Sequence, residues 1–102
     1  MTTQPKMEIK ELPLSDLKPA SYNPRKKLKK GDKEYEKIKQ SLLKFGYVDP
    51  IIVNEDLTVI GGHQRLTVLK DLKYETAKCV IVSLSKEDEK ALNIALNKIT
   101  GQ

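Results

Sequence analysis

The 102-residue sequence contains no tryptophan, one phenylalanine, one cysteine and one histidine. A single cysteine excludes a disulfide scaffold, and one cysteine with one histidine excludes a zinc site built from these two residue types. No apolar run approaches the ~18 residues that a membrane helix requires, and the first residues lack the apolar stretch of a signal peptide. These absences predict a soluble, cytoplasmic protein of one domain with no membrane partner.

Arginine is also scarce, and the positive charge is unevenly distributed. Of the 19 cationic residues 17 are lysine, and the only arginines are Arg25 and Arg65. The formal net charge is +5, and residues 25–44 hold the whole basic excess, with nine cations against three anions. This segment fits either a solvated helix face or a patch that faces nucleic acid, although few aromatic residues are interleaved for base stacking. The candidate DNA contacts are Lys26, Lys27, Lys29 and Lys30.

The first half of the chain predicts one strand and one helix. Residues 1–6 are expected to form a disordered lead and residues 7–102 the folded domain. The apolar alternation over residues 7–12 indicates an edge strand, and a turn-rich stretch with several prolines follows. A helix is expected between Asp32, a candidate N-cap, and Gly46, a C-terminal stop. Its core face is predicted to consist of Tyr35, Ile38, Leu42 and Phe45.

The second half predicts a hairpin, a helix, a strand and a last helix. Residues 51–53 and 57–60 read as paired strands around a turn, and a helix is expected from His63. Residues 77–84 are apolar on both faces, which is typical of a central strand. Ser85 and Asp88 resemble a capping box, and the helix behind them is predicted to bury Leu92, Ala95, Leu96 and Ile99. The predicted fold class is α+β, with a small mixed sheet and three to four helices.

The segment with the most chemical information is Gly61-Gly62-His63-Gln64-Arg65, where a strand runs through two glycines into a helix. Consecutive glycines permit positive φ and a close approach of a ligand to the backbone. The first amides of a helix lack internal partners and, with the helix dipole, attract anions. Arg65 can hold a phosphate in a two-pronged geometry that lysine cannot reproduce. The segment therefore predicts either a phosphate site or a plain glycine turn with a surface arginine.

Two further polar groups are weaker candidates. Asn23-Pro24-Arg25 offers donors on a stiff loop, or it is an exposed turn. Asn93 and Asn97 lie one turn apart at the edge of the apolar stripe, where they can reach a cleft or remain solvated. Cys79 lies in an apolar strand and is predicted to be a core thiol. The sequence shows no Walker motif, no nucleophile elbow and no spacing that singles out a catalytic carboxylate pair.

An ordered set of short motifs carries a resemblance to a known family. In order they are Tyr22-Asn23-Pro24-Arg25, Phe45-Gly46-Tyr47, Asp49-Pro50-Ile51-Ile52-Val53, Gly61-Gly62-His63-Gln64-Arg65 and Ala95-Leu96-Asn97-Lys98. Over about residues 7–100 the sequence resembles the ParB N-terminal domain of the ParB/sulfiredoxin superfamily. It looks most like ParB-like domains of phage and mobile-element proteins, which are often fused to or encoded beside DNA methyltransferases.

The resemblance implies a nucleoside triphosphate, CTP or ATP, as the ligand. The residues implied to bind it are Gly61, Gly62, His63, Gln64, Arg65, Asn23, Arg25 and Asn97. The family pattern Gly-Glu-Arg-Arg keeps only its first Gly and last Arg here. Leu96 replaces the glutamate of the partition proteins' Glu-Asn pair, which leaves Mg²⁺ binding and hydrolysis open. His63 replaces the reactive cysteine of sulfiredoxins, so no sulfiredoxin activity is expected.

Three functions follow as alternatives. The first is a nucleotide-binding module of a DNA-associated protein, as part of a longer or partnered protein. The second is a phosphotransfer enzyme, weak NTPase or nuclease of the same superfamily, for which no catalytic residue can be assigned. The third is a non-specific DNA-binding domain. The partners implied are nucleotide and DNA, with a methyltransferase domain and a homodimer as open alternatives.

Overall fold

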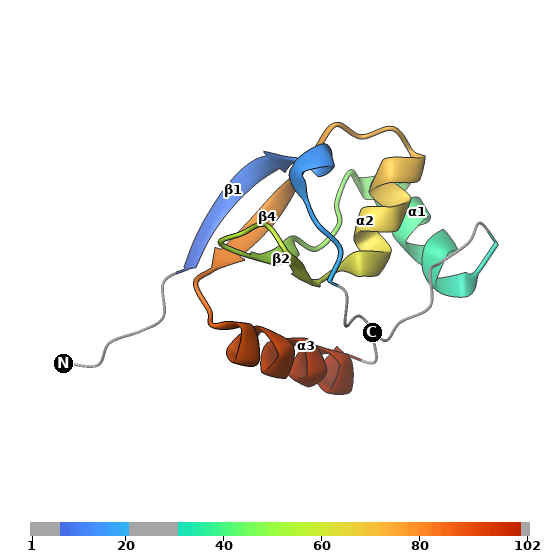
Figure 1. The fold of residues 1–102 in the computed structure, drawn as a ribbon. Helices are drawn as coiled ribbons and strands as arrows, with labels where there is room; N and C mark the ends of the chain where they lie inside the picture. Colours follow the sequence, from blue (N-terminus) through green and yellow to red (C-terminus); the bar gives the residue numbers. More distant parts are fainter. Residues whose placement is uncertain (1–6, 21–30, 101–102) are drawn as a thin grey trace.

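The computed structural model describes residues 7–20 and 31–100, with side chains described up to residue 96 (Figure 1). The elements are β1 (Met7–Pro13), the 3-10 turn η1 (Leu14–Asp16), α1 (Lys33–Phe45), β2 (Ile51–Asn54), β3 (Val59–Gly61), α2 (His63–Asp71), β4 (Thr76–Val82) and α3 (Lys86–Thr100). The predicted lead over residues 1–6 lies outside the described residues. Three α-helices and a mixed sheet confirm the predicted α+β class.

The four strands form one sheet in the order β1-β4-β2-β3. β4 pairs antiparallel with β1 and parallel with β2, and β2 pairs antiparallel with β3. The predictions of an edge strand at the start of the chain and a central strand at β4 are both confirmed. Beyond β3, Lys18 forms an isolated bridge with Thr58, so the chain after η1 borders that side of the sheet.

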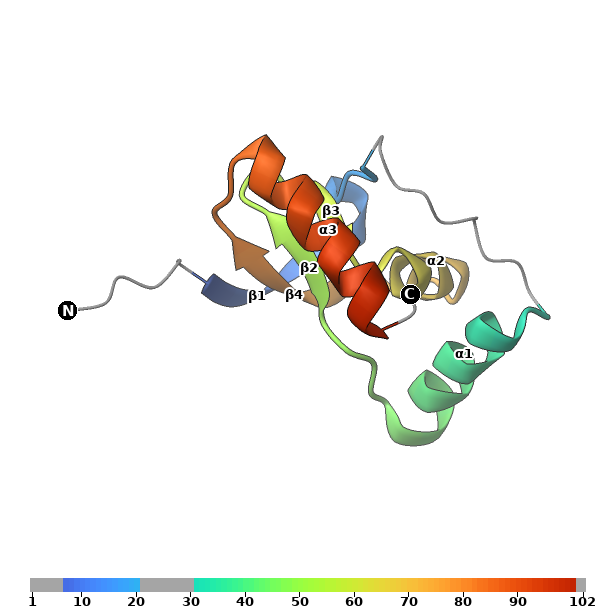
Figure 2. The same cartoon turned by 90° about the horizontal axis from the view of Figure 1, so that it is seen from below.

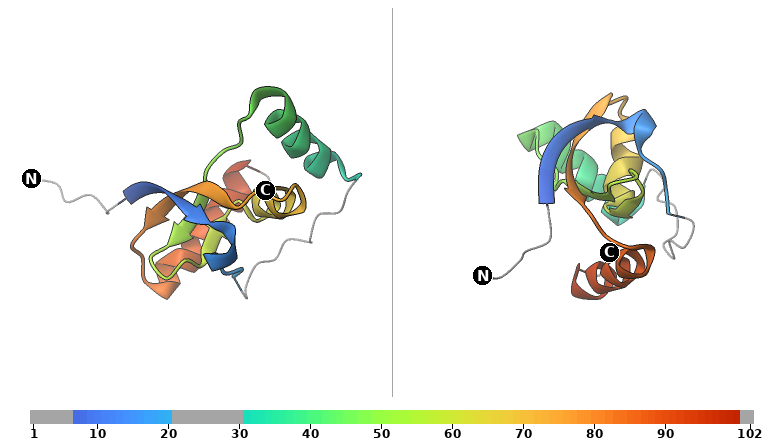
Figure 3. Two further views of the ribbon diagram at one scale, coloured as in Figure 1. Left: turned by 90° about the horizontal axis from the view of Figure 1, so that it is seen from above. Right: turned by 60° about the vertical axis from the view of Figure 1, so that its left-hand side comes forward.

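Helices cover both faces of the sheet. α1 and α2 pack together on one face, and α3 crosses the other face at its β3 end (Figures 2 and 3). Because side chains alternate along a strand, Ile51 and Val53 point toward α1 and α2 with Ala77 and Cys79. Cys79 is fully buried, which confirms the predicted core thiol, and burial raises its pKa.

α1 has the predicted boundaries but one wrong core residue. Tyr35 and Leu42 are buried, and the Tyr35 hydroxyl donates to Asp71 Oδ2 at 2.8 Å, which links α1 to the end of α2. Gly46 ends the helix at φ 68° and donates its amide to the Leu42 carbonyl. Phe45 is 72% exposed, so its predicted place in the core is wrong. The last turn of α1 extends past the core, and the Phe45 ring lies beneath the ammonium group of the neighbouring Lys44.

α3 is capped as predicted, but its buried residues differ from the prediction. The Asp88 amide donates to Ser85 Oγ at 3.2 Å. The buried side chains are the polar Glu89 and Asn93, whereas Leu92, Ala95 and Leu96 are only partly buried. Ile99 lies beyond the described side chains. Among the described helices, none is long and apolar enough to cross a membrane.

Candidate functional site

The turn between β3 and α2 is built around Gly62 and Arg65. Gly62 is the N-cap of α2 and adopts φ 92°, a left-handed conformation that favours glycine. A Cβ at this position would lie 2.9 Å from Arg65 Nη2. The guanidinium therefore folds back over the start of its own helix, and Gly62 is needed both for the turn and for this close approach.

Arg65 is a buried cation. It is 8% exposed, and its Nη2 donates to the Pro50 carbonyl at 3.2 Å. Burial lowers its pKa, while the charges of Asp49 and Tyr47 act in the opposite direction. An arginine stays protonated under these conditions, so the structure holds a positive charge at the first turn of α2. The surface-arginine alternative is therefore wrong, and the phosphate site at this turn remains a prediction.

A pocket of about 280 Å³ lies beside Gln64 and Arg65, and the turn residues Gly61, Gly62 and His63 do not line it. Gln64 and Arg65 form one wall, and α1 and the loop after α1 form the others. Lys37 supplies a second cation, and Glu34 and Asp49 supply two anions. The complete lining is Glu34, Lys37, Ile38, Ser41, Tyr47, Val48, Asp49, Gln64 and Arg65. The Tyr47 hydroxyl donates to Asp49 Oδ1 at 3.0 Å, and this bond raises the pKa of Tyr47.

Gly61 and Asn93 have packing roles at the same turn. A Cβ on Gly61 would lie 2.9 Å from Leu96 Cδ1, so this glycine admits a side chain of α3. Asn93 is 3% exposed and donates from Nδ2 to the Ile60 carbonyl at 2.8 Å. Asn93 is therefore neither solvated nor in a cleft, because it joins α3 to β3. The proximity of α3 to the glycine turn follows from these two contacts.

His63 begins α2 and is half-buried. Burial lowers its pKa, the Val59 backbone raises it, and the Arg65 charge lowers it further. The imidazole is thus neutral at pH 7, and its Nε2 has no hydrogen-bond partner among the described residues.

The other predicted site residues lie outside the described part of the chain. They are Asn23, Arg25, Lys26, Lys27, Lys29 and Lys30, together with the side chain of Asn97. Their roles remain predictions. The structure brings together Gly62, Gln64 and Arg65, with Gly61 and His63 on either side of the same turn.

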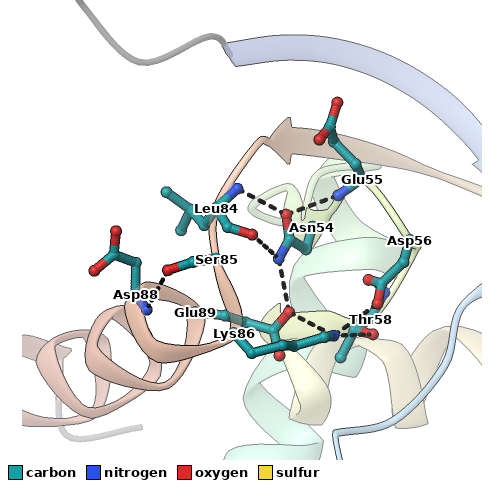
Figure 4. A network of polar contacts seen from close by, with 9 residues as sticks. All are labelled: Asn54, Glu55, Asp56, Thr58, Leu84, Ser85, Lys86, Asp88 and Glu89. Carbon is teal, nitrogen blue, oxygen red and sulfur yellow. Dashed lines mark hydrogen bonds and ion pairs between the residues drawn. The ribbon is translucent and has the colours of Figure 1, made fainter.

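Sequence reasoning missed a buried polar network at the start of α3 (Figure 4). Asn54, at the end of β2, donates from Nδ2 to Glu89 Oε1 at 2.7 Å and to the Leu84 carbonyl at 3.0 Å. Lys86 bridges Glu89 at 3.1 Å and Asp56 at 2.6 Å. The Lys86 contact lowers the pKa of Asp56 to about 2. Only the capping signal at Ser85 marked this region, because the Asn54–Glu89 contact spans 35 residues.

Comparison with known proteins places this arrangement in a family. A model of the ParB N-terminal domain matches residues 1–98. YnaK of Escherichia coli K12, named a ParB-like nuclease domain-containing protein, is 25% identical over 83% of this chain and 94% of its own length. Stage 0 sporulation protein J of Bacillus subtilis 168 is 28% identical over 76% of this chain, which spans only 28% of that protein.

Solved structures share the fold at low sequence identity. A pNOB8-like ParB N-domain superposes with a TM-score of 0.77 at 18% identity, covering 98% of this chain and 39% of that one. Truncated ParB from Caulobacter crescentus, complexed with CTP-γ-S, gives 0.71 at 17% identity over 93% and 54% of the two chains. Arabidopsis thaliana sulfiredoxin gives 0.64 at 22% identity over 83% and 96%. The predicted ParB/sulfiredoxin fold is confirmed.

Proposed function

The chain belongs to the ParB N-terminal domain family, and from that premise we propose that it binds a nucleoside triphosphate, CTP or ATP, at the start of α2. The observation that carries the proposal is the buried Arg65 guanidinium over the left-handed Gly62 turn. A cation and a helix N-terminus at one place attract the same ligand, an anion. The CTP-γ-S bound to the Caulobacter ParB supports a nucleotide as that anion.

The local chemistry of α2 is suited to an oxyanion such as phosphate. The guanidinium carries five donors in a planar fork, and one of them bonds to the Pro50 carbonyl. The first turn of α2 contains no acidic residue that would compete with a ligand. Lys37 lines the pocket on the α1 side and supplies a second positive charge for an extended phosphate chain. We propose that Asn23, Arg25 and Asn97 complete the site.

No magnesium ligand can be assigned among the described residues. Leu96 stands where the partition proteins carry a glutamate, and no group of three His, Cys, Asp or Glu side chains is placed to hold a metal ion within the described part of the chain. The proposal therefore includes no metal-dependent step. Nuclease or phosphotransfer activity remains a prediction without an assigned catalytic residue.

The wider role proposed is that of a module in a DNA-associated protein. The family and the chromosome-partitioning ParB of Caulobacter crescentus support this role. α1 carries Lys33, Lys37 and Lys44 on its exposed surface, and the predicted contacts Lys26, Lys27, Lys29 and Lys30 precede it. A setting beside a phage or mobile-element methyltransferase remains a prediction from the motifs.

Titration calorimetry with CTP, ATP and ADP tests the proposal. We expect Arg65→Ala to weaken the preferred nucleotide at least tenfold, about 1.4 kcal/mol. Because Arg65 also holds the Pro50 loop, Lys37→Glu provides a second variant outside the core, and we expect it to weaken binding several-fold. Lys44→Glu is its matched control, with the same charge change on the same helix outside this pocket.

Two outcomes would overturn the proposal. One is the absence of binding by every nucleotide at millimolar concentration. The other is equal binding by wild type, Arg65→Ala and Lys37→Glu, all with cooperative thermal unfolding, because the anion would then lie elsewhere.

A further inference from the structure

β1 has one unpaired edge in the described structure. It is the outermost strand of the sheet, and β4 occupies only its inner side. The opposite border of the sheet is shielded, since Lys18 donates to the Leu57 carbonyl and accepts from the Val59 amide there. An uncovered strand edge presents a row of amides and carbonyls that can pair with another strand.

The sheet face beside this edge is apolar and only partly covered. Met7 and Ile9 are 66% and 62% exposed, and they lie opposite Val82 and Val80 in the β1–β4 register. Directly opposite residues share a face in an antiparallel pair. α3 crosses the β3 end of the same face and leaves the β1 end open (Figure 2). The unpaired edge and the uncovered apolar residues therefore coincide.

We propose that β1 pairs with β1 of a second copy of this chain, antiparallel across a twofold axis that passes by Ile9. In this register Ile9 lies opposite Ile9, and Glu8 lies opposite Lys10 of the second copy, twice. Charge complementarity favours a second copy of this chain as the partner of β1. Glu8 and Lys10 are both exposed, and their charged groups lie 3.7 Å apart within one strand. Each can reach its opposite charge across the new strand pair.

The neighbouring symmetric registers are disfavoured by the same charges. A twofold axis at Glu8 places two glutamates opposite each other, and an axis at Lys10 places two lysines opposite each other. Like charges directly opposite destabilise a strand pair. An axis between two residues would turn the Ile9 side of one copy away from that of the other. The Ile9 register alone joins the two apolar faces and pairs both charges.

One strand pair buries less than the ~1,200 Å² typical of stable complexes, so the dimer is expected at high protein concentration. Sedimentation velocity without nucleotide measures its dissociation constant. We expect Glu8→Lys and Lys10→Glu each to weaken the dimer at least tenfold, because each change creates two like-charge pairs. Mixing the two variants restores association, since the two lysines of one variant then face the two glutamates of the other. Lys44→Glu and Glu87→Lys are the matched charge controls.

The register has a covalent test. Ile9→Cys is expected to form a disulfide-linked dimer under mild oxidation, because residues opposite each other in a strand pair are within disulfide reach. Met7→Cys, opposite Glu11 of the second copy, is expected not to form one. Cys79 is fully buried and serves as the internal control.

Three results would overturn the proposal. The first is a protein that stays monomeric up to about 1 mM, because a dissociation constant above that value is far weaker than that of a stable complex. The second is a dimer that neither single charge variant weakens. The third is a mixture of the two variants that associates no better than either variant alone. Unfolding curves of each variant establish that the fold is intact. The test uses no nucleotide, so its outcome is independent of the proposed nucleotide site.

Discussion

Helices α2 and α3 begin in opposite ways. α3 starts with a serine cap at Ser85 and has three acidic residues in its first turn, of which Glu89 is fully buried against Asn54. α2 starts at Gly62, which has no side chain to cap with, and its first turn has no acid but holds the buried Arg65. Both starts lie beside the β2–β3 hairpin.

The difference separates a structural helix start from one suited to a ligand. Carboxylates in the first turn neutralise the positive end of the helix dipole, so α3 satisfies its own start. At α2 the positive end of the helix dipole and the positive guanidinium lie together. Their mutual repulsion destabilises the chain, and together they attract an added anion. The contrast supports the proposal that α2, and not α3, receives the phosphates.

The largest loss of stability is expected at the start of α3. Glu89→Ala removes the buried acceptor of Asn54 and leaves a void, and we expect a loss of about 2–4 kcal/mol in the free energy of unfolding. Urea unfolding followed by circular dichroism measures it. Glu87→Ala removes an exposed carboxylate from the same turn and is expected to change stability by less than ~0.5 kcal/mol. Equal effects of the two variants would contradict a structural role for the network.

An intermediate loss of stability is expected at the start of α2. Gly62→Ala adds backbone strain at φ 92° and places a Cβ 2.9 Å from Arg65 Nη2, for a total cost of about 2 kcal/mol. Gly46→Ala is the matched control, because Gly46 also has positive φ but no atom within 4 Å of the added carbon. It is expected to lose only the strain, about 1 kcal/mol. Identical losses in urea unfolding would show that the Arg65 contact is not constraining.

The smallest expected effect distinguishes the two starts by pH. Burial lowers the pKa of His63 below its ordinary 6.5. As the pH falls, His63 is therefore protonated in the unfolded chain before it is protonated in the folded chain. The His63 contribution to stability is present above pH 6.5 and declines as the pH falls through the folded-state pKa. At the α3 start, the pKa of Asp56 is lowered from 3.8 to about 2, so that contribution declines only below about pH 4.

Thermal unfolding between about pH 7.5 and 5, a range that brackets the ordinary histidine pKa, measures the His63 contribution. We expect wild type to lose more stability over this range than His63→Gln does. Parallel profiles would show that His63 titrates alike in the folded and unfolded chains.

Local signals in the sequence predicted most of the fold. Gly46 as a stop, Ser85 as a cap and the apolar run of β4 are properties of neighbouring residues, and all three are confirmed. Phe45 was misplaced because helical periodicity does not show where the partner helix ends. The parallel pairing of β2 with β4 is a choice of the whole chain and has no local signature.

The sequence predicted which residues lie at the candidate site but not the contacts that they make. The sequence indicated the glycine turn and Arg65, because strand, glycines and helix are contiguous. It did not indicate that the guanidinium would bond to Pro50, or that Gly61 would admit Leu96. The burial of Asn93 and Glu89 was unexpected for the same reason, since a buried polar side chain is stable only with a distant partner that the local pattern does not reveal.

The pairing of β1 with β4 has a consequence for how the chain is made. Met7 lies opposite Val82, and Pro13 lies opposite Thr76. Contacts between such distant residues require closure of a long loop before they stabilise the chain, which slows folding. During synthesis, β1 therefore has no partner strand until β4 has also been made.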